Sequence, residues 1–375
     1  MGDEDPVVII GAGLAGAAAA WSLARRGRPV VVLEQFRPGH SAGSSHGSAR
    51  IVRRGYRDAL YTSLTGEAFE LWRTLEMSSG STLLRMLGGI DFGARRDVAA
   101  VASHLAANGV PHEVLPAAEA QARWPGMVFD TDVVYHAQAG TLDSAAAVTA
   151  MLEAAVRHGA VVRYETAVAA LRPPAAVQLA DGSSLAASCV VVAAGGWVGP
   201  LLDGLVLLPA LQVTQQQIFH FPRRDLSAPP WPSVIHEDEL RIYHLAGGRD
   251  GGAGDDRKIG DHDGGHETTA ATRDGVVDPG SRDRVARYVE RYLPGLDPTP
   301  RSEATCLYTD TPTEDFVLDR VGDIVVCSPC SGHGAKFAPL IGEYVASLVI
   351  GEGAVVPERF RLAAHAAGRS GSASL

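Results

Sequence analysis

Three short segments of the chain carry residue types that could perform chemistry together. Cys306 opens the first, which reads CLYTDTPTEDF over residues 306–316. The second, SGHGAKF at residues 331–337, is a glycine-rich turn with a histidine and a lysine, and the third is the glycine loop GAGLAG at residues 11–16. A thiol, a basic turn and a nucleotide-type loop in one chain suggest a flavin held through a thioether. That combination favours an amine oxidase over a pyridine-nucleotide dehydrogenase.

The glycine loop fits the GxGxxG fingerprint between a predicted strand at residues 7–10 and a predicted helix at residues 14–26. Gly11 permits the tight turn, Gly13 lets the backbone approach a pyrophosphate, and Gly16 allows the helix to pack closely on the strand. Leu14 and Ala15 begin the helix, whose free N–H groups and positive dipole end attract phosphate.

Glu34 supports the same interpretation, because it ends the next predicted strand 18 residues after Gly16. A carboxylate at this place accepts hydrogen bonds from ribose hydroxyls and repels a 2′-phosphate. The sequence therefore predicts an adenine dinucleotide, and this fingerprint is shared by NAD and FAD.

Composition excludes several classes of protein. The 375 residues with 46% hydrophobic content can form a large core, which we expect to be divided between two interleaved domains. We find no apolar stretch of about 18 residues that could cross a membrane. An acidic start and a short apolar run do not resemble a secretory signal, so a cytoplasmic protein is expected. The net charge of −10 argues against nucleic acid as a partner.

The four cysteines, Cys189, Cys306, Cys327 and Cys330, fit a reducing compartment better than a disulfide framework. Cys327 and Cys330 form a CxxC, but no second pair completes a zinc site. Aspartates and histidines also gather irregularly at residues 255–266 in a loop-like segment. No metal is expected.

The hydrophobic pattern predicts an α/β fold with a Rossmann-type unit. Further helices are expected at residues 61–76, 144–158, 281–293 and 340–350, and further strands at 29–33, 160–164, 190–196, 212–221 and 324–326. Asp181-Gly182 predicts a type I′ hairpin turn within residues 177–185. Glycine and aspartate dominate residues 246–265, which predicts a mobile loop, and the tail after about residue 364 is expected to be frayed.

Seven motifs together resemble the monomeric sarcosine oxidase and N-methyltryptophan oxidase family, within the glycine/D-amino-acid oxidase superfamily. They are the glycine loop, SHGSARIVR at 45–53, LW at 71–72, VVAAGGW at 191–197, KIGDH at 258–262, CLYT at 306–309 and SGHGAKF at 331–337. The similarity extends from residue 7 to about residue 361. It implies a Rossmann-type FAD-binding domain (1–80, 141–207 and 301–365) interleaved with a mixed-sheet α+β substrate domain (81–140 and 208–300), followed by a tail (366–375).

The resemblance implies FAD bonded covalently through its 8α-methyl group to the sulfur of Cys306. It places the other cofactor contacts, besides the glycine loop and Glu34, at Ser44, Ser45, His46, Arg50, Val168, Ala194, Gly195, Trp197, Gly332, His333, Gly334 and Lys336.

The resemblance also implies the residues that act on substrate and oxygen. Arg53 and Lys336 match the pair that holds the substrate carboxylate, a sensible anion clamp of a guanidinium fork and a point charge. Lys258 matches the lysine that activates dioxygen by electrostatic stabilisation. The remaining catalytic candidates are His46 and Arg50, a basic pair at the flavin face, together with His262 and Tyr308.

Three departures from the family concern the substrate pocket. Ala49 replaces a hydroxyl residue, His244 stands near a position usually held by tyrosine, and Cys330 replaces an aromatic residue. His244 is therefore taken as a substrate-binding residue in a roomier, more polar pocket, which argues against sarcosine itself as the substrate.

The expected function is an FAD-dependent oxidase of a secondary amino acid, N-methyl or cyclic. Hydride transfer to the flavin gives an imine, and reoxidation by O2 gives H2O2. The alternative is a flavin-dependent dehydrogenase or desaturase that tailors a cyclic or N–N-bonded amino acid in a biosynthetic pathway. A flavoprotein that serves only as a binding scaffold is disfavoured by the retained substrate and oxygen residues. The expected partners are a small amino acid and O2, without nucleic acid or membrane, and the protein is expected to be a monomer or weak homodimer.

Overall fold

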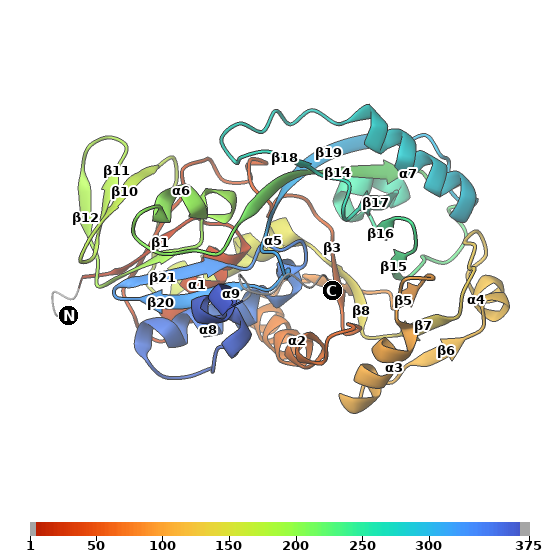
Figure 1. The fold of residues 1–375 in the computed structure, drawn as a ribbon, viewed down its shortest axis with the longest axis horizontal. Coiled ribbons are helices and arrows are strands. Elements are labelled where there is room, and N and C mark those ends of the chain that lie inside the picture. The colour runs from red at the N-terminus through yellow and green to blue at the C-terminus, as the bar shows by residue number, and fades with distance from the viewer. Residues whose placement is uncertain (1–4, 368–375) are drawn as a thin grey trace.

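The computed structural model describes residues 5–367, which fold around two large β-sheets placed side by side (Figure 1). Within these residues, no helix is both long and apolar enough to span a membrane. Helix α9 (Leu362–Ala367) occupies the first residues of the tail that was expected to fray, so that expectation is wrong up to residue 367. The rest of the predicted tail lies outside the described residues.

The first sheet has six strands in the order β20-β21-β13-β1-β2-β9. Their bounds are β1 (Val7–Ile10), β2 (Val30–Leu33), β9 (Val161–Arg163), β13 (Cys189–Val192), β20 (Val317–Val321) and β21 (Ile324–Ser328). All neighbours are parallel except the edge strand β20. The valine-rich inner strands are buried on both faces, as parallel strands between two layers must be.

Alternate residues of β1 point to opposite layers. Val7 and Ile9 pack in the core formed with helices α1 (Leu14–Ala24), α2 (Ala59–Ser79), α5 (Ser144–Arg157) and α8 (Ala338–Ile350). Val8 and Ile10 pack with α6 (Val198–Leu202) and with a small sheet of β10 (Val168–Arg172), β11 (Ala176–Leu179) and β12 (Ser184–Ala186). The strand–helix–strand unit predicted at the N-terminus is therefore confirmed.

The second sheet is mixed and has nine strands, in the order β18-β14-β17-β16-β15-β5-β7-β6 with β19 paired to β14. Their bounds are β5 (Gly89–Phe92), β6 (Glu113–Leu115), β7 (Val133–His136), β14 (Gln212–Phe221), β15 (Ser233–Glu237), β16 (Arg241–Ala246), β17 (Arg257–Asp261), β18 (His266–Glu267) and β19 (Ser302–Asp310). Helix α7 (Pro279–Tyr292) packs on it, and α3 (Val98–Ala107) and α4 (Ala117–Arg123) lie at its far end (Figure 1). A second three-stranded sheet, β3 (Arg50–Arg53), β8 (Ala139–Leu142) and β4 (Leu84–Met86), lies between the two large ones.

The division of the chain into two discontinuous domains stays a prediction. The pairing of β19 does not follow this predicted division. β19 belongs to the segment assigned to the FAD-binding domain, but it pairs with β14 of the substrate segment over nine residue pairs. This strand therefore shares a sheet with the segment before residue 300 and not with the segment that follows it.

The glycine- and aspartate-rich segment at residues 246–265 is not the mobile loop that its composition predicted. It contains a 3-10 helix, η2 (Gly248–Gly254), and the fully buried strand β17 between β14 and β16. Asp250 anchors it, since its carboxylate accepts from the Ser48 amide at 2.6 Å and its own amide donates to the Ser48 hydroxyl at 2.9 Å. Composition was misleading here because the glycines allow backbones to pack together.

The predicted hairpin between β11 and β12 is present, but its turn type is wrong. A type I′ turn needs positive φ at both central residues, and of Asp181 and Gly182 only Gly182, at φ 90°, has it. The Gly182 amide donates to the Leu179 carbonyl and the Leu179 amide to the Ser183 carbonyl. This is a three-residue loop that ends in a left-handed glycine.

Candidate active site

A cavity of about 700 Å³ runs along the edge of the first sheet, where the strands end, and reaches β19 of the second. Tyr308 lines this cavity, and so do most of the residues predicted to contact the cofactor. The predicted cofactor contacts that line it are Gly11, Gly13, Leu14, Ala15, Glu34, Ser44, Ser45, His46, Arg50, Val168, Ala194, Gly195, Trp197, Cys306, Gly332 and Gly334. Three predicted contacts, Gly16, His333 and Lys336, are not among the lining residues.

The glycine loop has no room for side chains. Gly11 has φ 101°, and a Cβ there would lie 2.6 Å from the Ala193 carbonyl oxygen. A Cβ on Gly16 would lie 1.9 Å from the Gly11 carbonyl oxygen, which explains why Gly16 packs behind the loop and not in the cavity. The first amide of α1, at Leu14, donates to the Ser45 hydroxyl at 3.0 Å and so ties the loop to the next segment. This bare backbone at a helix start fits the pyrophosphate of a dinucleotide.

Glu34 is buried at the end of β2, beside this loop. Its carboxylate accepts from the Ala12 amide at 2.9 Å and from the Phe36 amide at 3.0 Å. Both bonds hold the carboxylate at the cavity wall, where it can accept further bonds from ribose hydroxyls. The lining residues thus fit FAD.

Cys306 is a free, buried thiol on β19 that lines the same cavity. Burial raises the pKa of the thiol, while the charges of Arg50, Lys258 and Arg273 act in the opposite direction. The effect of burial is the larger, so the thiol form is favoured, and the three neighbouring cations limit the rise in pKa.

The loop at residues 44–50 presents two basic groups to the cavity. The Nε2 atom of His46 is buried without a hydrogen-bond partner, and burial together with Arg50 lowers the pKa of its imidazole to about 4. The guanidinium of Arg50 donates only to backbone carbonyls, those of Ser44 and Ala49 at 2.9 Å and that of His46 at 2.6 Å. Its positive charge has no carboxylate partner among the described residues.

Lys258 lies on β17 and is only 3% exposed. Its Nζ donates to the Ala49 carbonyl at 2.8 Å. Burial, and then the charge of Arg50, lower the pKa of this ammonium to about 7. The strand register therefore brings a second unpaired cation beside Cys306.

Arg53 and Lys336 form a second cationic site beside Tyr56. The guanidinium of Arg53 lies 4.0 Å from the centroid of the Tyr56 ring, and the Lys336 Nζ lies 5.6 Å from it. Both side chains are buried, and burial lowers the pKa of both groups. Arg53 further lowers that of Lys336, which shows that the two cations are close.

Within residues 5–367, neither cation has a close anionic partner. Lys336 Nζ donates to the His333 carbonyl at 2.8 Å, and the nearest carboxylate to Arg53, that of Asp91, is 3.8 Å away. Asp91 is engaged more closely by Arg96, at 2.6 Å, and Arg53 Nη1 is buried without a hydrogen bond. Buried positive charge without a partner is costly, and an anionic ligand would neutralise it.

Two tyrosines and a histidine join this region to the turn at residues 331–337. The side chains of Tyr308 and Tyr243 interact, and the rings of Tyr308 and His262 have centroids 5.3 Å apart. Gly332 touches both rings, since a Cβ there would lie 2.5 Å from His262 Cε1 and 2.8 Å from Tyr308 Cε2. Burial raises the pKa of Tyr308 and lowers that of His262, so both groups are neutral near pH 7.

The structure corrects the prediction made for His244. This imidazole is buried on the face of β16 opposite to Tyr243, where its Nδ1 accepts from the Arg257 Nε at 2.8 Å. Side chains alternate along a strand, so an error of one residue moves a side chain to the other face. Tyr243, the preceding residue, lies on the other face of the strand, beside Tyr308. Sequence reasoning missed it, although the alternation over residues 241–246 could have revealed it.

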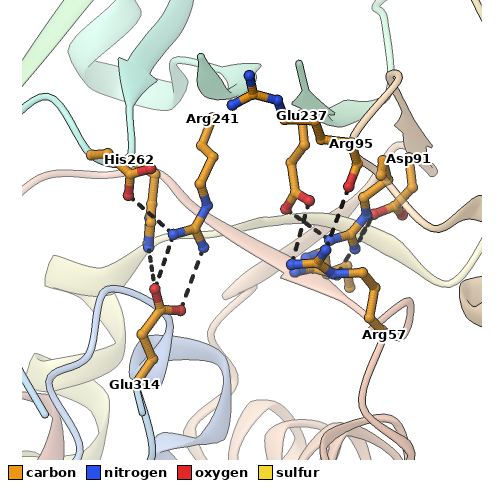
Figure 2. Close-up of polar contacts among 10 residues, drawn as sticks. Arg57, Asp91, Arg95, Glu237, Arg241, His262 and Glu314 are labelled. Carbon is orange, nitrogen blue, oxygen red and sulfur yellow. Dashed lines mark hydrogen bonds and ion pairs between the residues drawn. The ribbon is translucent and has the colours of Figure 1, made fainter. Parts of the chain in front are cut away.

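Figure 2 shows two groups of ion pairs. In one, Arg241, on the same face of β16 as Tyr243, bonds Glu314 at 2.9 Å and Asp263 at 3.0 Å, while His262 Nε2 lies 3.9 Å from Glu314. In the other, Arg96 bridges Asp91 and Glu237, and Arg57 reaches Glu237 at 3.6 Å. The second group includes Asp91, the carboxylate nearest to Arg53, and Arg96 binds that carboxylate more closely than Arg53 does.

His333 holds the turn and does not face the cofactor cavity. Its Nδ1 is 3.3 Å from the Tyr56 hydroxyl and its Nε2 is 3.1 Å from the Glu314 carbonyl. Burial and the charge of Lys336 lower the pKa of this imidazole to about 3, so it stays neutral. Cys327 and Cys330, from the CxxC, line the cavity next to this turn.

Known proteins resemble this chain over most of its length. The DAO family, described as FAD dependent oxidoreductase, matches residues 6–348. Monomeric sarcosine oxidase from Streptomyces avermitilis is 33% identical over 365 residues, with 92% of this chain and 93% of that protein covered. Peroxisomal sarcosine oxidase from Homo sapiens is 30% identical, with 91% of both covered. The structure of NikD, an amino acid oxidase essential for nikkomycin biosynthesis, superposes with a TM-score of 0.84 at 25% identity, covering 96% of this chain and 98% of that one. These matches confirm the predicted resemblance and fold class.

Proposed function

The chain belongs to the DAO family of FAD-dependent oxidoreductases, and on that basis we propose that it oxidises a secondary amino acid, N-methyl or cyclic, at the expense of O2. When bound, FAD supplies the redox chemistry: it takes a hydride from the carbon next to nitrogen and passes two electrons to O2, which leaves an imine and H2O2. The protein contributes binding, orientation and charge.

The observation that carries this proposal is the pair of buried cations, Arg53 and Lys336, without a close anion. A carboxylate between them would accept charge-assisted hydrogen bonds from both and remove the unfavourable proximity of two positive charges. The clamp would therefore select amino acids over simple amines.

The same cations would also set the protonation state of the substrate. A bound ammonium group near Arg53 and Lys336, in a site that excludes water, has a lowered pKa and loses its proton readily. A neutral nitrogen can donate electron density to the carbon that loses hydride, so no side-chain base is required. Tyr243, Tyr308 and His262 would then serve to position the amine.

Lys258, with Arg50 and the neutral His46, would serve oxygen. A fixed cation stabilises negative charge as an electron reaches O2, and Lys258 is held in place by its bond to the Ala49 carbonyl. In this proposal Arg53 and Lys336 bind the substrate, and Lys258 assists the reaction with O2.

Covalent attachment of FAD at Cys306 is part of the proposal. The support is that this thiol lines the cavity, faces three cations and lies on a well-packed strand. Because the sulfur is buried, competing thiol chemistry with solvent molecules would be slow.

Anaerobic titration of the yellow protein with N-methyl and cyclic amino acids tests the proposal. The flavin absorbance should bleach with these substrates and return, with release of H2O2, when O2 is admitted. Bleaching without prompt return in O2 would favour the dehydrogenase or desaturase alternative, which the small Cys330 side chain at the cavity wall leaves possible. No bleaching with any amino acid would contradict the proposed function. The cytoplasmic location and the monomeric or weakly dimeric state stay predictions.

A further inference from the structure

A buried histidine outside the cavity has one nitrogen without a partner. His236, on β15, is 1% exposed, and its Nε2 has no hydrogen bond. Its Nδ1 lies 3.0 Å from the Tyr288 hydroxyl, and its ring stacks on Phe92 with centroids 4.0 Å apart. The ring is thus held in one orientation, with Nε2 left to face something else.

Two carboxylates lie where this nitrogen points. Asp130 Oδ1 is 4.0 Å from His236 Nε2, and one ligand atom each from Asp130, His236 and Asp238 lie within 4.8 Å of one another. The other oxygen of Asp130 accepts from the Tyr292 hydroxyl at 3.1 Å. An outer hydrogen bond that orients a ligating group and leaves its second atom free is typical of metal sites.

We propose that Asp130, His236 and Asp238 bind a divalent transition-metal ion of the zinc class, a site distinct from the proposed active site. One imidazole and two carboxylates are ligands that such ions accept, and water can complete the coordination. Ligand atoms in a tetrahedral zinc site are about 3.4 Å apart, so the exposed Asp130 carboxylate would move by about half an ångström toward His236, and the three atoms, which lie within 4.8 Å of one another, would close by at most about 1.4 Å.

The ion would connect segments that are far apart in the sequence. Asp130 precedes β7, His236 and Asp238 flank the end of β15, and the two supporting tyrosines belong to α7. None of the three ligands lines the cofactor cavity. The expected role is therefore stabilisation of this end of the second sheet, independent of the amine chemistry.

The test uses tag-free holoprotein freed of metal by a chelator. Zn²⁺ and Mn²⁺ are titrated by calorimetry, and thermal unfolding is followed with and without Zn²⁺. We expect one Zn²⁺ per chain and a rise in Tm. Asp130→Asn and Asp238→Asn should each weaken binding at least about tenfold and reduce the rise in Tm, a typical size for disturbance of a metal site.

Glu239→Gln is the matched control, because Glu239 is an exposed neighbouring acid outside the cluster. It should bind Zn²⁺ as the unaltered protein does. Both asparagine variants remove partly exposed groups, so folding of each is checked by its flavin spectrum. Absence of saturable binding, or binding that neither asparagine variant weakens, would overturn the proposal. Equal weakening by Glu239→Gln would also overturn it, since that result indicates attraction to surface charge alone.

Discussion

Replacement of Lys258 by methionine separates the two halves of the proposed reaction. Methionine has nearly the length of lysine and fills the buried space on β17, but it carries no charge. The Ala49 carbonyl loses one hydrogen bond, and the cavity next to Cys306 loses one of its unpaired cations. The clamp residues Arg53 and Lys336 are untouched, so substrate binding should persist.

The size of the effect follows from charge. Two unit charges about 5 Å apart at an effective dielectric constant of about 20 attract by about 3 kcal/mol. If Lys258 stabilises negative charge on the oxygen, its loss slows reoxidation by about two orders of magnitude. Flavin reduction by substrate, which gains nothing from this cation, should change by less than about tenfold.

Stopped-flow absorbance measures both steps, first anaerobically with substrate and then with O2 against prereduced protein. The pH dependence adds a second readout. Because the pKa of Lys258 is lowered to about 7, the cation is present below that pH and is lost above it. The reoxidation rate should therefore fall as pH rises through about 7, or through a somewhat higher value when an anion bound nearby stabilises the cation. The methionine variant should show no such fall.

Lys258→Arg is the matched control, since it keeps the charge in the same place and should retain more of the rate than methionine. Equal losses in reduction and reoxidation for Lys258→Met would refute the assignment to oxygen. Such a result would mean that the lysine supports the site as a whole.

The remaining predictions concern attachment, substrate and pH. Cys306→Ser should release FAD when the protein is denatured in acid, whereas flavin fluorescence should stay with the unaltered polypeptide on a gel; free flavin from the latter would contradict covalent attachment. Arg53→Gln or Lys336→Gln should lower kcat/KM by a factor that corresponds to a loss of about 2–4 kcal/mol of transition-state stabilisation. The reason is that the substrate carboxylate loses a partner in a desolvated site. An amine without the carboxylate should react poorly and change little with these variants, and the reverse pattern would exclude an amino-acid substrate. His136 and His220 are buried with a pKa lowered to about 4, so the unfolded state binds more protons between pH 6.5 and 4. Stability, measured by urea unfolding, should be full above pH 6.5 and fall below it by up to about 1.4 kcal/mol per pH unit for each histidine, and stability that stays constant down to pH 5 would disprove their burial in neutral form.

The parts of the fold that could be predicted depend on local signals. The run of valines in β1, the glycines after it and the alanine-rich α1 each have one good local interpretation, and they agree with one another. Helix α2 also has clear local signals at both ends. It begins after the N-cap residue Asp58 and ends at Gly80, which has a φ of 68°.

The errors occurred where local composition and tertiary packing disagree. Residues 246–265 have the composition of a loop, yet the partners β14 and β16 bury β17 within it. The assignment of His244 failed because the family pattern gives a position, while the face of a strand is decided by register. Tyr243 was one residue away.

The candidate metal site could not be found from sequence spacing. Asp130 lies more than 100 residues before His236, and the tyrosines that orient the two ligands lie on another helix. Sequence motifs for metals are recognisable when ligands are close in the chain, and here the fold alone brings them together.

Strand order also decides when a newly made chain can acquire its flavin. β13 pairs with β1 on one side and with β21 on the other, and the ribosome makes β21 only near the end of synthesis. The cofactor loop also depends on later segments, because its Ser48 and Ala49 are held by Asp250 and Lys258. Contacts between such distant residues form slowly and late. Loading of FAD is therefore a property of the completed polypeptide, and a nascent or truncated chain that ends before β19 should emerge colourless.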